Sequence, residues 1–211
     1  MNTTEKEISY NITNTYSTLN TLSSKTKNVW FVCHGIGYLS RYFLKYFKEL
    51  NPEVNYIIAP QASSKHYLGS AYKHVGASWL TKENTKAEIE NIMQYFDAVF
   101  ASEKIPKDKK LIVLGYSQGV SIAMRYVAKR HLQCSQLLLL SGGLPNELVA
   151  EDFKFLNAKV SLVFGDDDEF INEERMKQEK YKIETLFGNN VNIITFEGKH
   201  EVKIEIINSF V

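Results

Sequence analysis

Apolar and polar residues follow two recurring patterns along the chain. Short runs of mostly branched apolar residues are typical of strands that are covered on both faces. These runs occupy residues 29–33, 54–59, 111–114, 136–140, 160–164 and 191–196. Longer segments place apolar residues every three or four positions, which predicts amphipathic helices. They occupy residues 39–50, 83–102, 117–130 and 172–187, with a last helix ending near residue 210. The alternation predicts an α/β fold, with a mostly parallel central sheet and helices on both of its faces.

Two segments depart from this alternation. Residues 7–22 change loosely between apolar and polar positions, which predicts a hairpin at the edge of the sheet. Residues 61–82 have no clear period and contain Gly69 and Gly76, so we expect a long connection with a functional role or high mobility. No repeat or linker interrupts the 211 residues, and we expect one domain over residues 1–211.

Composition and charge narrow the classes of partner. The formal net charge of +1 gives no electrostatic reason to bind nucleic acid or an anionic membrane. Cys33 and Cys134 do not make a disulfide framework, and each is expected to be a buried free thiol beside an apolar run. No apolar run has the length of a membrane span, and the polar start MNTTEKE lacks the layout of a signal peptide. We therefore expect a cytoplasmic protein with no nucleic-acid partner and no integral membrane segment.

The strand at 111–114 leads directly into a helix through Gly115-Tyr116-Ser117-Gln118-Gly119. This is the G-x-S-x-G pattern between a strand and a helix, where the central serine occupies a tight, strained turn. The turn exposes the Ser117 hydroxyl at the positive end of the helix, where backbone N–H groups have no partners. We therefore expect Ser117 to be a nucleophile. The alternative is an ordinary serine in a glycine-rich loop. A nucleophilic role for Ser117 therefore requires that the chain also supply a base and an acid in the expected order.

A nucleophilic serine needs a base, and imidazole is the side chain suited to that role near neutral pH. His200 directly follows the last strand, on the edge of the sheet where the serine turn is expected. His34 precedes a glycine turn and is expected to shape it by hydrogen bonding. His66 and His74 lie in the long connection, and His131 is at the far end of the helix that starts at Ser117. We therefore expect His200 to be the base.

The base needs a carboxylate that fixes its tautomer, and in this architecture the order is serine, acid, histidine. The run at 166–168, Asp166-Asp167-Asp168, follows the penultimate strand and lies between Ser117 and His200 in the sequence. One member is expected to be the acid and the others to be turn or capping residues. Spacing does not choose among the three.

An oxyanion needs two backbone donors. One is expected from the N–H of Gln118, directly after the nucleophile. The other is expected from the N–H of Ile36, in the turn that Gly35 permits after the strand at 29–33. An ordinary glycine turn is the alternative for that second segment.

Five short stretches of the sequence, taken together and in their order along the chain, carry a resemblance to a known family. They are HGIG at 34–37, APQA at 59–62, GYSQG at 115–119, LSGGLP at 140–145 and GKH at 198–200. From about residue 28 onward the chain resembles the phospholipase/carboxylesterase family of α/β-hydrolases, which includes acyl-protein thioesterases and small bacterial carboxylesterases. The resemblance implies an α/β-hydrolase fold without a large lid domain, and catalysis without a metal or organic cofactor. It also implies that Asp168 is the acid. The family places its catalytic acid at the end of a G-x-x-D turn, and residues 165–168 match that pattern.

Three departures from the family pattern concern the substrate pocket. Tyr38 stands where an acidic residue is frequent, residues 79–81 read Trp-Leu-Thr in place of Trp-Phe-Asp, and Val120 replaces a second glycine. Aromatic residues supply either an apolar wall of that pocket or the packing of their own loop: Tyr38, Tyr67, Tyr72 and Trp79.

The expected function is that of a serine hydrolase, which cleaves small-molecule carboxylic esters or thioesters through an acyl-enzyme with Ser117, His200 and Asp168. Two alternatives remain on the same scaffold. One is a peptidase or C–C bond hydrolase, and the other is a binding protein that performs no chemistry.

Overall fold

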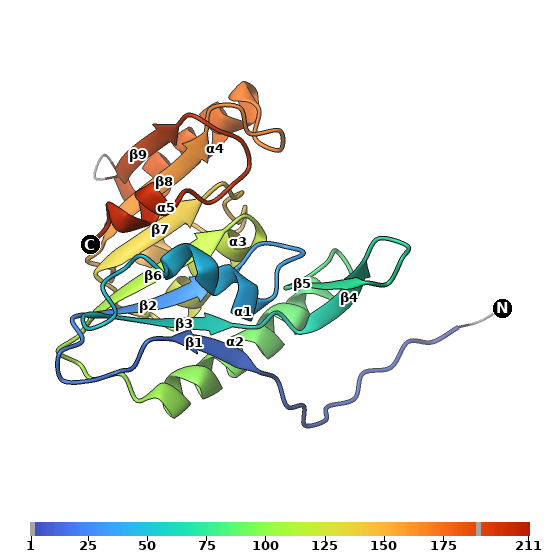
Figure 1. The fold of residues 1–211 in the computed structure, drawn as a ribbon. Coiled ribbons are helices and arrows are strands. Elements are labelled where there is room, and N and C mark those ends of the chain that lie inside the picture. The colour runs from blue at the N-terminus through green and yellow to red at the C-terminus, as the bar shows by residue number, and fades with distance from the viewer. Residues whose placement is uncertain (1–2, 189–190) are drawn as a thin grey trace.

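The computed structural model describes residues 3–188 and 191–211. Within these residues, seven strands form one sheet in the order β1-β3-β2-β6-β7-β8-β9 (Figure 1). Their bounds are β1 Tyr16–Leu19, β2 Asn28–Cys33, β3 Asn55–Pro60, β6 Lys110–Tyr116, β7 Gln136–Leu140, β8 Lys159–Gly165 and β9 Val191–Phe196. In this sheet β1 pairs with β3 antiparallel and the other five pairs are parallel, which confirms the mostly parallel sheet.

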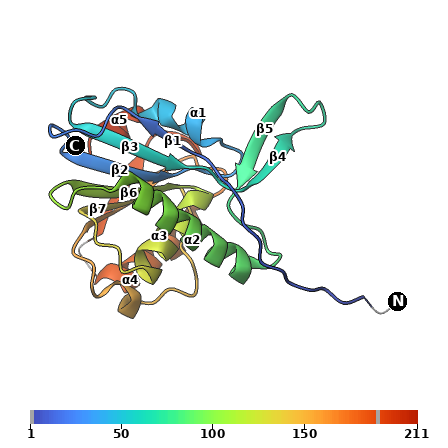
Figure 2. The same ribbon diagram turned by 90° about the horizontal axis from the view of Figure 1, so that it is seen from below.

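Helices cover both faces of this sheet, as the alternating pattern predicts (Figure 2). One face packs against α2, α3 and α4, and the other packs against α1, η1 and α5. The bounds are α1 Ser40–Phe43, the 3₁₀ helix η1 Leu44–Phe47, α2 Thr85–Glu103, α3 Gln118–Lys129, the 3₁₀ helix η2 Ala150–Phe153, α4 Glu173–Phe187 and α5 Ile204–Asn208. None of the helices in the described ranges has the length and apolar character needed to cross a membrane.

The central strands are apolar at consecutive positions because each side of the sheet has its own core. In β2, Val29 and Phe31 point into the core under α2 and α3, while Trp30 and Val32 point into the core under α1 and α5. The indole N–H of Trp30 donates to Oδ1 of Asn55, so its one polar atom is paired in that core. Successive side chains of a strand alternate between faces, and two covered faces therefore require a continuous apolar run.

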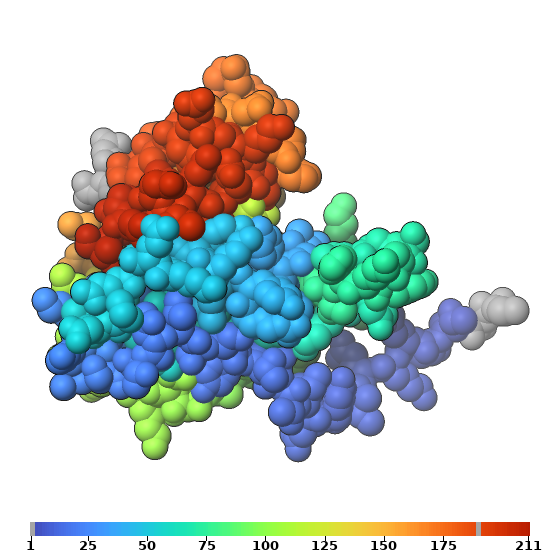
Figure 3. Space-filling model, in the orientation of Figure 1, coloured from blue at the N-terminus to red at the C-terminus, as the bar shows by residue number. Residues whose placement is uncertain are grey.

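The structure corrects three expected elements. The predicted edge hairpin is one strand, β1, and the preceding residues 3–15 are extended and mostly exposed because no partner strand lies beside them. The expected connection over 61–82 contains a separate antiparallel hairpin of β4, Ser64–Leu68, and β5, His74–Ser78, whose turn end projects from one side of the molecule (Figure 3). The expected helix over 39–50 is split into α1 and η1, although its apolar face is buried as predicted.

Candidate active site

Ser117 joins β6 to α3 in the tight turn that the sequence pattern predicts. Its backbone has φ of 53° and ψ of −119°, a left-handed conformation that L residues rarely adopt. The flanking glycines are required by close backbone contacts. A Cβ at Gly119 would overlap the carbonyl oxygen of Cys33, and a Cβ at Gly115 would lie 2.5 Å from Cα of Val120. The turn therefore depends on glycine at both positions.

The side chains of Ser117, His200 and Asp168 form a continuous hydrogen-bonded series. Oγ of Ser117 lies 2.9 Å from Nε2 of His200. Nδ1 of His200 lies 2.8 Å from Oδ2 and 3.0 Å from Oδ1 of Asp168. The Asp168 side chain is fully buried and the His200 side chain is 13% exposed, so water reaches the series mainly from the serine end.

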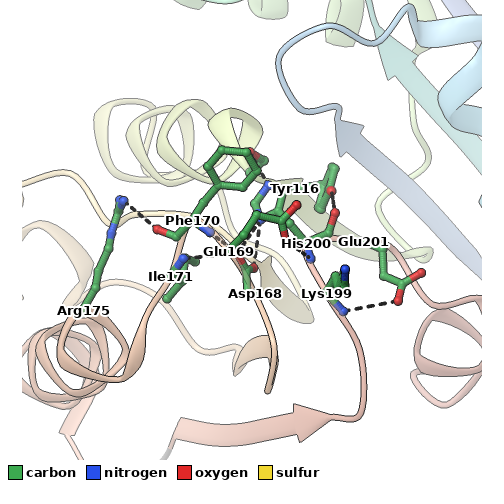
Figure 4. Close-up of polar contacts among 10 residues, drawn as sticks. Tyr116, Asp168, Glu169, Phe170, Ile171, Arg175, Lys199, His200 and Glu201 are labelled. Carbon is green, nitrogen blue, oxygen red and sulfur yellow. Dashed lines mark hydrogen bonds and ion pairs between the residues drawn. The ribbon is translucent and has the colours of Figure 1, made fainter.

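The turn after β8 orients the carboxylates of Asp166 and Asp168 differently, and Figure 4 shows the Asp168 carboxylate beside His200. Oδ1 of Asp168 accepts hydrogen bonds from the N–H groups of Phe170 at 2.9 Å and Ile171 at 3.1 Å, which fix the carboxylate toward His200. Oδ1 of Asp166 accepts from the N–H of Gly198 at 2.9 Å and thereby holds the loop that carries the histidine. Asp168 is therefore the member of the acidic run that contacts the imidazole.

Three further side chains surround His200 (Figure 4). The hydroxyl of Tyr116 donates to the backbone carbonyl of His200 at 2.8 Å. The backbone N–H of His200 donates to Oε2 of Glu169 at 3.3 Å. The ring of Phe170 packs edge-on against the imidazole, with centroids 4.8 Å apart. Sequence reasoning missed all three, because these contacts join segments that no local pattern connects.

The environment fixes the protonation of two of these neighbours. Burial raises the pKa of Tyr116 far above its usual value, so its hydroxyl keeps the proton that it donates. Hydrogen bonds from its own backbone N–H and from that of His200 lower the pKa of the exposed Glu169 carboxyl. Glu169 is therefore an ionised acceptor near neutral pH.

The two predicted oxyanion donors lie at turns beside the serine. Gln118 is the first residue of α3, and Ile36 lies in the turn after β2. Among the hydrogen bonds of the described residues, neither backbone N–H has an acceptor. A Cβ at Gly35 would lie 3.1 Å from Cβ of Ser117, which shows how closely this turn approaches the serine.

His34 shapes its turn by hydrogen bonding. Its Nε2 accepts from the N–H of Ala62 at 3.2 Å, so Nδ1 carries the proton and donates to the carbonyl of Gly35 at 2.8 Å. Burial lowers the pKa of His34 to about 4, which keeps the ring neutral near pH 7. The remaining histidines lie elsewhere: His66 and His74 are exposed residues of β4 and β5, and His131 is beyond the end of α3.

β5 and the residues after it form hydrogen bonds with both turns that carry the candidate oxyanion donors. The N–H of Gly37 donates to the carbonyl of Ala77 at 2.9 Å. The carboxamide of Gln118 accepts from the N–H of Trp79 at 2.8 Å and donates to the carbonyl of Leu80 at 2.7 Å. The turn after β2 and the start of α3 are therefore both hydrogen-bonded to one short segment, residues 77–80, which fixes their separation.

The predicted pocket aromatics have different positions. Trp79 is 1% exposed, and its indole N–H donates to the carbonyl of His34 at 2.7 Å, so it packs in the core. Tyr72 is 70% exposed and packs edge-on against Tyr67 on the hairpin. Tyr38 is half-buried, and its hydroxyl lies 3.0 Å from that of Tyr46. These three aromatic residues do not form one continuous wall.

Both cysteines are free and buried, as the sequence predicts. The described ranges contain no cluster of three or more His, Cys, Asp or Glu side chains arranged to hold a metal ion.

The family of the chain follows from a match to a family model. The phospholipase/carboxylesterase model matches residues 14–210. The chain belongs to the phospholipase/carboxylesterase family. This confirms the resemblance inferred from the five sequence stretches, and it supports an esterase- or thioesterase-type hydrolase. No curated protein sequence matches the chain.

Solved structures share the fold. Acyl-protein thioesterase 2 of Zea mays is similar at 16% identity over 93% of this chain and 96% of that one, with a TM-score of 0.69. Esterase PE8 is similar at 20% identity over 94% and 98% of the two chains, also with a TM-score of 0.69. A phospholipase/carboxylesterase of Dyadobacter fermentans is similar at 18% identity over 95% and 97%, with a TM-score of 0.66. These similarities confirm the α/β-hydrolase fold.

Proposed function

We propose that this protein is a serine hydrolase that cleaves carboxylic esters or thioesters through an acyl-enzyme. Ser117 is the nucleophile, His200 the base and Asp168 the acid. The observation that carries the proposal is the unbroken series of hydrogen bonds, 2.9 Å from Ser117 to His200 and 2.8 Å from His200 to Asp168. Membership of the phospholipase/carboxylesterase family supports the reaction class.

In the acylation step, Oγ of Ser117 attacks the carbonyl carbon of the substrate while Nε2 of His200 takes the hydroxyl proton. Before the transfer, the Nδ1–H of the neutral imidazole donates to the buried Asp168 carboxylate, which holds the ring in the tautomer that accepts at Nε2. After the transfer, the same carboxylate stabilises the imidazolium. The N–H groups of Ile36 and Gln118 stabilise the charge on the carbonyl oxygen. A well-placed oxyanion donor lowers the barrier by about 2.7–4 kcal/mol.

The imidazolium then returns its proton to the leaving alkoxide or thiolate, and the carbonyl reforms on Ser117 as an acyl ester. In the second step a water molecule loses a proton to Nε2 of His200 and attacks the acyl carbon. Collapse of that intermediate releases the carboxylic acid and restores the serine hydroxyl. The same base and the same backbone donors serve both steps.

The surroundings of Ser117 favour a substrate with apolar groups next to the scissile bond. Ile36, which follows the close-packed Gly35, is 56% exposed. Phe170 is 63% exposed and packs against His200. Exposed apolar side chains at a reactive centre are available to bury apolar parts of a substrate.

The test uses the purified full chain with p-nitrophenyl esters of rising acyl length and an acyl-CoA thioester. We expect Ser117→Ala to fold and to lose hydrolysis of both substrate types. Ser102→Ala is the matched control, because that hydroxyl pairs with Tyr16 at the end of α2 and has no contact with His200.

Near-native hydrolysis by Ser117→Ala would overturn the proposal. A folded wild-type chain that hydrolyses neither substrate type would also overturn it and would favour a binding protein or a hydrolase of peptide or C–C bonds. The ratio of ester to thioester turnover identifies the preferred substrate type.

A further inference from the structure

His200 lies in an irregular segment between β9 and α5, so no helix or strand fixes its backbone. The loop is anchored before the histidine, where Gly198 donates to Oδ1 of Asp166 at 2.9 Å and accepts from the N–H of Asp167 at 2.9 Å. At His200 itself, the orientation of the imidazole depends on the hydrogen bonds made by the backbone N–H and the backbone carbonyl of this residue.

Those two peptide groups have one partner each, on opposite sides of the residue. The N–H of His200 donates to the Glu169 carboxylate at 3.3 Å, and its carbonyl accepts from the Tyr116 hydroxyl at 2.8 Å. The two contacts differ in environment. Glu169 is exposed, whereas Tyr116 is 3% exposed. Water replaces an exposed acceptor at small cost, but a buried hydroxyl that is removed leaves its partner unpaired.

Tyr116 also contacts the imidazole ring directly. The two ring centroids lie 5.3 Å apart, and Phe170 packs on the same imidazole with centroids 4.8 Å apart. The rotation of the His200 side chain is therefore restricted by aromatic rings, while the position of its backbone is set by the Tyr116 hydroxyl.

Tyr116 is the last residue of β6 and directly precedes Ser117. A single residue thus connects the strand that presents the nucleophile to the loop that carries the base, across 84 positions of sequence. Movement of the loop away from the sheet lengthens the contact between Nε2 of His200 and Oγ of Ser117, which is 2.9 Å long. Proton transfer depends on that contact.

We propose that Tyr116 is a positioning residue for His200, whose hydroxyl holds the histidine loop at the distance from Ser117 that proton transfer requires. This inference rests on the proposed function. An apolar ring at this position would supply the same packing without the hydrogen bond, so the proposed role belongs to the hydroxyl and not to the ring.

The test compares Tyr116→Phe with Tyr126→Phe. Both substitutions remove one hydroxyl from a tyrosine that is 3% exposed, and the hydroxyl of Tyr126 donates to Asp97 at 3.0 Å, with no contact to the series of catalytic side chains. Loss of one neutral buried hydrogen bond changes an equilibrium by about two- to tenfold. We expect Tyr116→Phe to lower kcat for a p-nitrophenyl ester by about that factor with KM unchanged. We expect Tyr126→Phe to lower the unfolding temperature without changing kcat.

A second readout does not depend on turnover. The Nδ1 proton of His200, shared with Asp168, gives a separate downfield NMR resonance when the loop is held in one position. We expect this resonance to broaden or shift in Tyr116→Phe and to be unchanged in Tyr126→Phe. A role confined to stability predicts similar thermal losses and an unchanged resonance in both variants.

Unchanged kcat and an unchanged resonance in Tyr116→Phe would overturn the inference, and so would equal losses of kcat in the two variants. The proposed function is tested separately by Ser117→Ala. If that variant is inactive while Tyr116→Phe behaves like wild type, the serine hydrolase stands and the positioning role fails. If the wild-type chain hydrolyses no ester or thioester, the failure is that of the proposed function.

Discussion

Replacing Asp168 with asparagine tests the hydrogen-bonded series of Ser117, His200 and Asp168 at its buried end. Oδ1 of Asp168 accepts from two backbone N–H groups, those of Phe170 and Ile171. In Asp168→Asn the amide oxygen must occupy that position, because an NH₂ group there would face two donors. The NH₂ group then lies where Oδ2 is now, 2.8 Å from Nδ1 of His200. The amide oxygen lies 3.0 Å from the same Nδ1, so the NH₂ group makes the shorter of the two contacts. We therefore expect Nδ1 to accept from the NH₂ group and the imidazole proton to move to Nε2.

An Nε2 that carries a proton has no lone pair for the Ser117 hydroxyl, which lies 2.9 Å away. The geometry is preserved, but the proposed base then carries its proton on the nitrogen that faces the serine. This kind of exchange lowers kcat by about 10⁴-fold, and a factor of 10⁴ corresponds to about 5 kcal/mol of barrier. The expected loss is therefore far larger than that expected from Tyr116→Phe.

The assay is steady-state hydrolysis of a p-nitrophenyl ester near pH 7, with ¹⁵N NMR of the imidazole to identify the tautomer. Asp166→Asn is the matched control, because an asparagine oxygen still accepts from Gly198. We expect the control to lower kcat less than about threefold, consistent with a preserved neutral hydrogen bond. If Asp168→Asn folds and loses less than about tenfold in kcat, the tautomer argument is refuted.

Three further predictions follow from contacts around the serine turn. Burial lowers the pKa of His34 to about 4 from 6.5, so the unfolded chain binds more protons in that interval and stability falls as pH decreases from about 6.5 to about 4. Denaturant unfolding should show a loss of about 3 kcal/mol over this range that His34→Asn lacks, and an equal slope in both proteins would contradict the argument. Gln118→Met leaves the N–H of Trp79 without its acceptor, so the start of α3 loses its hydrogen bond to that residue. We expect a lower kcat, an unchanged KM and weaker binding of a boronic acid transition-state analogue. Gly119→Ala places a methyl group against the carbonyl of Cys33, and calorimetry should show destabilisation of about 1–3 kcal/mol or more; an unaltered unfolding temperature would mean that the turn relaxes.

The sheet could be predicted from the sequence because its strands are buried on both faces. Each central strand packs one core on each side, so its sequence is a continuous apolar run with clear ends. The hairpin of β4 and β5 gave no such signal. All of β4 is exposed, and its sequence SKHYL has no buried face to produce a contrast between alternate positions. The edge strand β1 was placed correctly at the rim, but its expected partner was the wrong segment.

The positions of Ser117 and His200 could be predicted because Ser117 directly follows β6 and His200 lies in the loop after β9, and parallel strands end at a common edge. The choice between Asp166 and Asp168 could not be made from spacing. It depends on the turn after β8, which aims one carboxylate at Gly198 and the other at the imidazole. The Tyr116 contact was likewise invisible, since it joins residues 84 positions apart through a carbonyl group that every residue possesses.

The most direct test of the account is mass spectrometry of the chain quenched in acid during the first turnover of a p-nitrophenyl ester. The account predicts an acyl group on the peptide that contains Ser117, absent from Ser117→Ala. An acyl group on another residue, or turnover of the ester without any acylated peptide, would contradict it.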